Sequence, residues 1–283
     1  MNQSRWILLT LSAVPMALTL SSGLCMGGPE DYKSPYSVKF AHPKSDLIGD
    51  IERGTRGDRH LESDVPFHEW YSPKTLHEYG SWGPGQRLYP AAPQTAGKSV
   101  DWLRERVIAV ALRFEGYGYQ HHHVPDWDPP ANWPWKHTGV GHNGKGADCS
   151  NFVSFVYNQG FGIKMHSGIH ELADQREMSG PGGRPIRVEH IARPDSYEGW
   201  AKTLKTGDLL FIKGSPKGPV THVVLWIGSI GQSDVPLILD SHGDGVKDEN
   251  GAVIPCGIHL RPFRKNSWYA KDASHATRVF SGK

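Results

Sequence analysis

The sequence predicts an α+β fold in which helices come first and a run of short strands follows. Between residues 99 and 160 apolar residues recur at helical spacing, whereas after residue 208 they form short runs rich in Val, Ile and Leu. Turns of Gly, Pro and Ser separate these runs, as expected for an antiparallel sheet packed against helices. With 33 Gly and 21 Pro among 283 residues, long ordered loops are also predicted.

Composition and charge place the chain among globular proteins. Hydrophobic residues make up 37% of it, and Lys and Arg number 31 against 29 Asp and Glu. This balance argues against a disordered or coiled-coil chain. The net charge of +2 also gives no special attraction to nucleic acid, so we expect no nucleic-acid partner.

Residues 1–27 have the three parts of a secretory signal peptide. A short basic start ends at Arg5, an apolar stretch covers residues 7–20, and small residues follow at 21–23. The apolar stretch is shorter than the roughly 20 residues that span a bilayer. We therefore expect a secreted or periplasmic protein without stable membrane insertion once the signal is cleaved. The alternative is an uncleaved anchoring helix.

Two further regions follow the signal. Residues 28–97 are rich in Pro, Gly, His and charge, and predict an extended N-terminal segment. Residues 98–283 carry the predicted helices and strands. The first helix runs from a capping Ser99 to Glu115 and ends at Gly116. A long Trp- and Pro-rich loop comes next, and loops of this length are usually functional.

The second predicted helix begins after Asp148 and has its natural stop at Gly160. Phe152, Val153, Phe155 and Val156 form its apolar stripe. The strands are then expected over four runs, at residues 208–212, 220–227, 235–239 and 258–260.

The three cysteines are Cys25, Cys149 and Cys256, an odd count that leaves at least one thiol free in an oxidising compartment. Cys256 lies in an apolar turn, where a buried inert thiol is expected, although pairing with Cys25 stays open. Cys149 lies at the start of the second helix. Unpaired backbone N–H groups and the helix dipole stabilise a thiolate there, which predicts a nucleophile.

A nucleophilic cysteine needs a base, and the best candidate is His222 at the start of an apolar strand. It shares a face with Val224 and Trp226. The next strand ends in Asp240-Ser241-His242, so His242 is expected to accept a hydrogen bond from His222 and fix its tautomer. Asp240 points to the same face and is the rival for this third role.

These motifs together resemble the NlpC family of cell-wall cysteine peptidases. The resemblance rests on Asp148-Cys149-Ser150, on residues 205–211 (KTGDLLF), on residues 221–226 (THVVLW) and on a strand ending in His242. It covers roughly residues 99 to 265. It implies a papain-like α+β fold, with the nucleophile's helix packed against an antiparallel sheet. It also implies cleavage of amide bonds in peptidoglycan stem peptides, typically between D-glutamate and a diamino acid.

The resemblance also implies roles for single residues. Cys149 would be the nucleophile, His222 the base and His242 the third member of the triad. Tyr119 would lie near the oxyanion or the substrate amine, while Asp148 and Ser150 would bind the free amino end of the stem peptide. The chain departs from the family where Asn151 replaces the usual Gly, and where residues 120–122 replace Trp-Gly-Gly.

Three other functions compete with a hydrolase. The run His121-His122-His123 suggests zinc, but adjacent histidines seldom bind one ion, and we expect no metal or other cofactor. Trp127, Trp133 and Trp135 could stack on sugars in a non-catalytic cell-wall glycan-binding module, although anchoring the loop is the simpler role. The same Cys–His site could also transfer an acyl group to another acceptor.

Overall fold

A computed structural model describes residues 32–51, 72–79, 86, 88–119, 147–243 and 245–282. Its helices are α1 (Lys44–Ile48), α3 (Pro73–Tyr79), α4 (Val100–Ala111), α5 (Cys149–Phe161), α6 (Ile169–Asp174), α7 (Tyr197–Thr203) and α8 (Trp268–Lys271), and its short 3-10 turns include η2 (Leu112–Phe114). Its strands are β1 (Ser37–Val38), β2 (Glu177–Ser179), β3 (Pro185–Arg187), β4 (Glu189–Ala192), β5 (Leu209–Lys213), β6 (Val220–Trp226), β7 (Gly231–Gln232), β8 (Leu237–His242), β9 (Gly257–Pro262) and β10 (Ala273–Arg278).

The main sheet has six strands in the order β4-β10-β5-β6-β8-β9, and every neighbouring pair is antiparallel. The four strands predicted from the sequence form its β5, β6, β8 and β9, with bounds that differ from the prediction by at most three residues. In register, Leu225 of β6 lies between Leu209 of β5 and Leu239 of β8. The strand that ends in His242 is therefore the direct neighbour of the strand that carries His222.

Helix α5 forms where the sequence predicts it, but it ends later. The side chain of Asp148 caps its start by accepting a hydrogen bond from the Asn151 backbone N–H. Gly162, in a left-handed conformation with φ of 67°, ends the helix two residues beyond the predicted stop. Gly160 serves close packing instead, because a Cβ there would come within 3.2 Å of a Val110 methyl group on α4.

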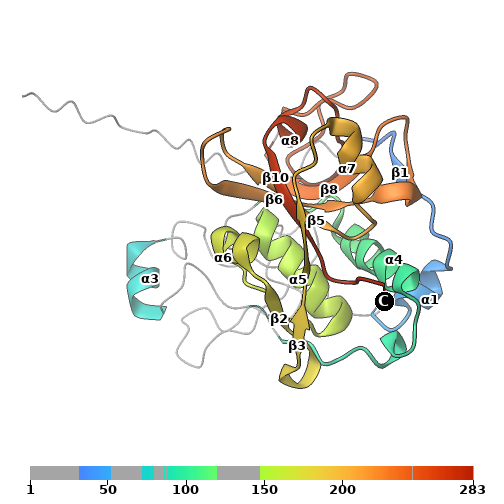
Figure 1. The fold of residues 1–283 in the computed structure, drawn as a ribbon, viewed down its shortest axis with the longest axis vertical. Helices are drawn as coiled ribbons and strands as arrows, with labels where there is room; N and C mark the ends of the chain where they lie inside the picture. The colour runs from blue at the N-terminus through green and yellow to red at the C-terminus, as the bar shows by residue number, and fades with distance from the viewer. Residues whose placement is uncertain are drawn as a thin grey trace, which may run out of the picture.

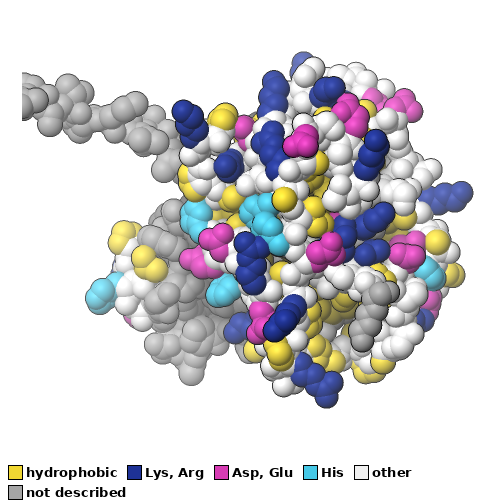
Figure 2. All heavy atoms as spheres, viewed as in Figure 1, with side chains coloured by type: hydrophobic (Ala, Val, Ile, Leu, Met, Phe, Trp, Pro, Cys, Tyr) yellow, Lys and Arg dark blue, Asp and Glu magenta, His cyan; other side chains and the backbone are white. Residues whose placement is uncertain are grey.

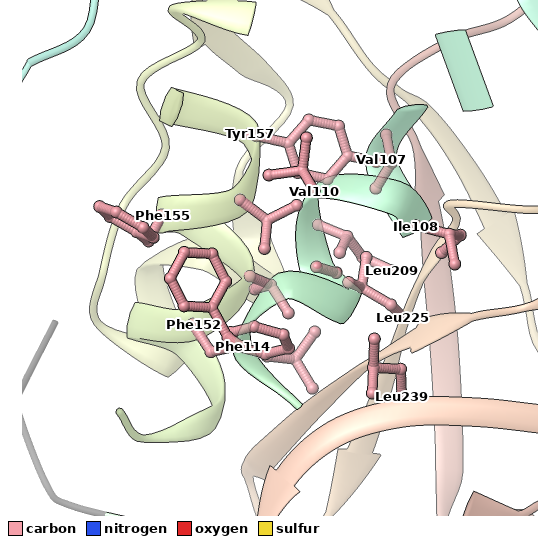
Figure 3. Packing of buried hydrophobic residues seen from close by; sticks show 14 of the residues in the cluster. Val107, Ile108, Val110, Phe114, Phe152, Phe155, Tyr157, Leu209, Leu225 and Leu239 are labelled. Carbon is pink, nitrogen blue, oxygen red and sulfur yellow. The ribbon is translucent and has the colours of Figure 1, made fainter. Parts of the chain in front are cut away.

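Helices α4 and α5 lie side by side below the sheet in Figure 1 and cover one of its faces. Apolar side chains from both helices meet those of β5, β6 and β8 in this layer (Figure 3). Residues that alternate with them along the strands, among them Val224 and Trp226, enter a second cluster with Trp200 of α7. The prediction of an α+β fold, with the nucleophile's helix packed against an antiparallel sheet, is confirmed.

The described part of the N-terminal segment docks on α4. Arg106 of α4 is buried and forms a two-point ion pair with Asp50, with N–O distances of 2.8 and 2.7 Å. Glu105 accepts hydrogen bonds from the backbone N–H groups of Ala41 and His42. Residues 32–51 are thus tied to the domain that follows. The predicted boundary between residues 97 and 98 stays a prediction.

The face of the molecule in Figure 2 carries Lys and Arg interspersed with Asp and Glu, in keeping with the small net charge. Across the ranges that the structure describes, no helix has the length and apolar character needed to cross a bilayer. The predicted signal peptide, residues 1–27, lies outside these ranges.

Candidate active site

Cys149 is the first residue of α5, as predicted, and its thiol is free. The start of this 13-residue helix, where the positive end of its dipole lies, is therefore at the residue that carries the sulfur. Asn151 strengthens the helix start because its side-chain amide donates to Asp148 at 2.9 Å. Cys256 is disulfide-bonded, so the expectation of an inert thiol there is wrong.

Backbone contacts fix the segment before the nucleophile. The hydroxyl of Ser241, on β8, donates to the carbonyl of Ala147 at 2.5 Å. The N–H of Ala147 in turn donates to the carbonyl of Gly118 at 3.3 Å, beside Tyr119. The start of α5 is therefore held between β8 and the end of the chain segment that carries Tyr119.

His222 lies near the start of β6 and is buried, with a relative exposure of 5%. Its Nε2 is 2.8 Å from Oδ2 of Asp240, which lies on the adjacent strand β8. Burial alone would lower the pKa of His222, but the charge of Cys149 and the hydrogen bonds to Asp240 and Cys149 outweigh it and raise the pKa to about 9. The sulfur and the imidazole are thus within interaction range, as a nucleophile–base pair requires.

Asp240 is fully buried and accepts three hydrogen bonds. Besides His222, the Tyr269 hydroxyl donates to Oδ2 at 2.9 Å and Arg261 Nε donates to Oδ1 at 2.8 Å. Burial would raise the pKa of Asp240, yet the Arg261 guanidinium and His222 hold it well below its usual range. Asp240 is therefore ionised and accepts the Nε2–H of His222, which leaves Nδ1 to exchange a proton with Cys149.

The predicted hydrogen bond between His222 and His242 is not among the contacts of the described residues. The two rings meet edge to face with centroids 5.0 Å apart, and His242 Nδ1 lies 3.0 Å from the carbonyl oxygen of Gly243. Burial lowers the pKa of His242, so this ring is uncharged at neutral pH. The sequence predicted His242 as the hydrogen-bond partner of His222 and Asp240 as the alternative. In the structure the partner is Asp240.

The other predicted site residues build the helix start or lie beside it. Both carboxylate oxygens of Asp148 accept hydrogen bonds from Asn151. The Ser150 hydroxyl donates to the carbonyl of Ser167 at 2.6 Å, and both Asp148 and Ser150 are buried. These contacts give the two residues a structural role. Their binding of a substrate amine stays a prediction, as does the role of half-buried Tyr119 toward the oxyanion.

Sequence reasoning missed three residues that surround the His222–Asp240 pair. Arg261 and Tyr269 donate to Asp240, and the Trp268 ring lies 5.5 Å from the His222 ring by centroids. Arg261 had a usable signal, because it directly follows the apolar run predicted as a strand at residues 258–260, and an arginine buried there needs a charged partner. Trp268 and Tyr269 come from the four-residue helix α8, which has no periodic pattern of its own.

Several sequence-based predictions lie outside the described residues. They concern Cys25, the His121–His123 zinc alternative, and the loop tryptophans Trp127, Trp133 and Trp135. Within the ranges that are described, no group of three or more His, Cys, Asp or Glu side chains is arranged to hold a metal ion.

In comparisons with known proteins, residues 132–269 match the model of the NlpC/P60 family. The chain is also similar to the crystal structure of an NlpC/P60 family protein from Bacillus cereus ATCC 10987, with 17% identity and a TM-score of 0.36. That alignment covers 65% of this chain and 41% of the other, so this chain spans less than half of that protein. No curated protein matches the sequence at a significant level.

Proposed function

We propose that this chain hydrolyses amide bonds in peptidoglycan stem peptides, because residues 132–269 match the model of the NlpC/P60 family, whose members are generally cysteine peptidases that act on cell-wall peptidoglycan. The observation that carries this proposal is the contact of a free cysteine, at the start of a helix, with a buried histidine that is hydrogen-bonded to a buried carboxylate. The bond between D-glutamate and a diamino acid is the proposed target.

The first half of the proposed reaction forms a thioester. Cys149 and His222 rest as a thiolate–imidazolium pair, and the thiolate attacks the amide carbonyl carbon. The negative charge that develops on the carbonyl oxygen is stabilised by the N–H groups at the start of α5. His222 then gives its Nδ1 proton to the amide nitrogen, the C–N bond breaks and the amine leaves.

In the second half, neutral His222 removes a proton from a water molecule as the water attacks the thioester carbonyl. The C–S bond breaks, the carboxylic acid leaves, and the thiolate–imidazolium pair is restored. Throughout, Asp240 keeps the ring in one tautomer and orientation and stabilises its charged form. Arg261 and Tyr269 keep Asp240 ionised and in place.

Export is part of the proposal. We propose that residues 1–27 direct the chain out of the cytoplasm, which places the enzyme where peptidoglycan lies. Family members are often cell-wall associated or secreted, in keeping with this location.

Mass spectrometry of digested muropeptides tests the function. We expect shortened stem peptides in which each cut adds one water, with a new free amine on the diamino acid. Products that carry another acceptor in place of water would identify an acyltransferase. Muropeptides that are retained by the protein but never shortened would support the glycan-binding module.

The pH profile of cleavage tests the charged state of His222. Because its pKa is raised to about 9, the ring keeps the proton for the leaving amine up to that pH and loses it above. We expect the initial rate to fall as pH rises through about 9. Asp240→Asn removes a carboxylate that raises the pKa of His222, so in this variant the rate should begin to fall at a lower pH. An alkaline limb at the same pH in both proteins would contradict this assignment.

A further inference from the structure

A pocket of about 620 Å³ opens beside the catalytic histidine. His242 and Tyr269 form the wall that it shares with the active site, Trp268 and Val246 add apolar surface, and Lys247 and Arg264 line it with positive charge. None of the described residues that line it is Asp or Glu. The described lining therefore combines an aromatic wall with two cations.

The position of the pocket identifies the half of the substrate that it faces. In the proposed reaction the imidazole of His222 protonates the leaving amine, so the leaving residue must lie on the imidazole side of the sulfur. The rings of His242 and Trp268 lie 5.0 and 5.5 Å from the His222 ring by centroids. A pocket formed by these two rings thus lies where the leaving residue extends.

The two cations determine which ligand groups the pocket favours. Arg264 is half-buried and donates one hydrogen bond to the Lys247 carbonyl at 2.6 Å, which fixes the guanidinium beside the loop that carries Lys247. A further contact to the Tyr36 hydroxyl is long, at 3.5 Å. A guanidinium has five N–H donors, and its remaining ones suit a carboxylate.

We propose that this pocket binds a free carboxylate on the leaving half of the substrate, with Arg264 and Lys247 as its specificity-determining residues. This inference rests on the proposed amidase function and deepens it. The enzyme would favour amide bonds whose amine side is a diamino acid with an unblocked carboxylate. Neutral and amidated leaving residues would be poor substrates, because the cations lose their partner.

A matched pair of synthetic stem peptides tests the proposal. Both share the same acyl half, and the leaving diamino acid carries either a free carboxylate or the corresponding carboxamide. We expect the wild-type protein to prefer the carboxylate by about tenfold or more in kcat/KM, as for a hydrogen bond to a charged group. In Arg264→Gln and in Lys247→Gln the preference should fall several-fold towards one.

Two controls distinguish a loss of substrate preference from general damage to the active site. Lys265→Gln removes an exposed cation next in sequence, whose partner is the exposed Glu198 and which does not line the pocket, so it should keep the wild-type preference. An activated ester of the same acyl half, with a neutral leaving group, should acylate all three variants at the wild-type rate.

Each outcome bears on one proposal. If the wild-type protein cleaves both peptides equally well, or if Arg264→Gln and Lys247→Gln keep its preference, the carboxylate pocket is wrong while the amidase function stands. If the wild-type protein cleaves neither peptide and is not acylated by the ester, the proposed function itself fails.

Discussion

Replacing Cys149 by Ala is expected to abolish cleavage of peptidoglycan stem peptides, with a loss on the order of 10⁴-fold or more in kcat. The alanine has no atom that can form the thioester, and what remains at the helix start offers only hydrogen-bond donors. Release of soluble muropeptide fragments, followed by chromatography, measures the loss.

The variant should remain folded, because the change removes one sulfur atom from the first turn of α5. Its thermal unfolding, followed by circular dichroism, is the control. Ser167→Ala is a matched variant, because only the carbonyl of Ser167 makes a described contact near the site, and it should keep its activity. Cleavage by Cys149→Ala at a rate near that of the wild-type protein would contradict a cysteine mechanism.

The second large effect is expected at Asp240. Asp240→Asn removes the negative charge that faces both His222 and Arg261, so the imidazolium loses its stabilising partner and the histidine can adopt the other tautomer. We expect activity to fall by about 10²- to 10⁴-fold. Leaving Arg261 buried without its carboxylate should also lower the free energy of unfolding, by up to about 3–5 kcal/mol.

His242→Asn provides the comparison for this prediction. His242 is two residues further along the same strand and makes no described hydrogen bond to His222, so its replacement should cost much less activity than Asp240→Asn. Initial rates and urea denaturation of both variants, below their unfolding temperatures, measure the two effects. A greater loss of activity in His242→Asn would restore the triad that the sequence analysis favoured.

The helices and central strands were predictable because they have strong local patterns. Helix α4 has a capping Ser99 and apolar residues at helical spacing, and strand β6 is a continuous apolar run. Strand β10 was missed because its sequence, ASHATR, has no large apolar residue. It belongs to the sheet through its pairing with β4 and β5, which no local pattern reveals.

The same distinction between local patterns and long-range contacts applies to the candidate site. Cys149 and His222 were predictable because a helix start and an apolar strand give each residue its setting. The choice between Asp240 and His242 was not, since both lie on one face of β8. It depends on Arg261 and Tyr269, which lie 21 and 29 residues beyond Asp240 and reach it only in the folded sheet.

The central claim is that the sulfur of Cys149, activated by His222, is the reacting atom. Titration with iodoacetamide, followed in parallel by intact-protein mass spectrometry and by muropeptide release, tests it most directly. We predict that activity falls in proportion to a single carbamidomethyl group on Cys149, and that His222→Ala is labelled more slowly. Full modification of Cys149 with undiminished cleavage would contradict the account.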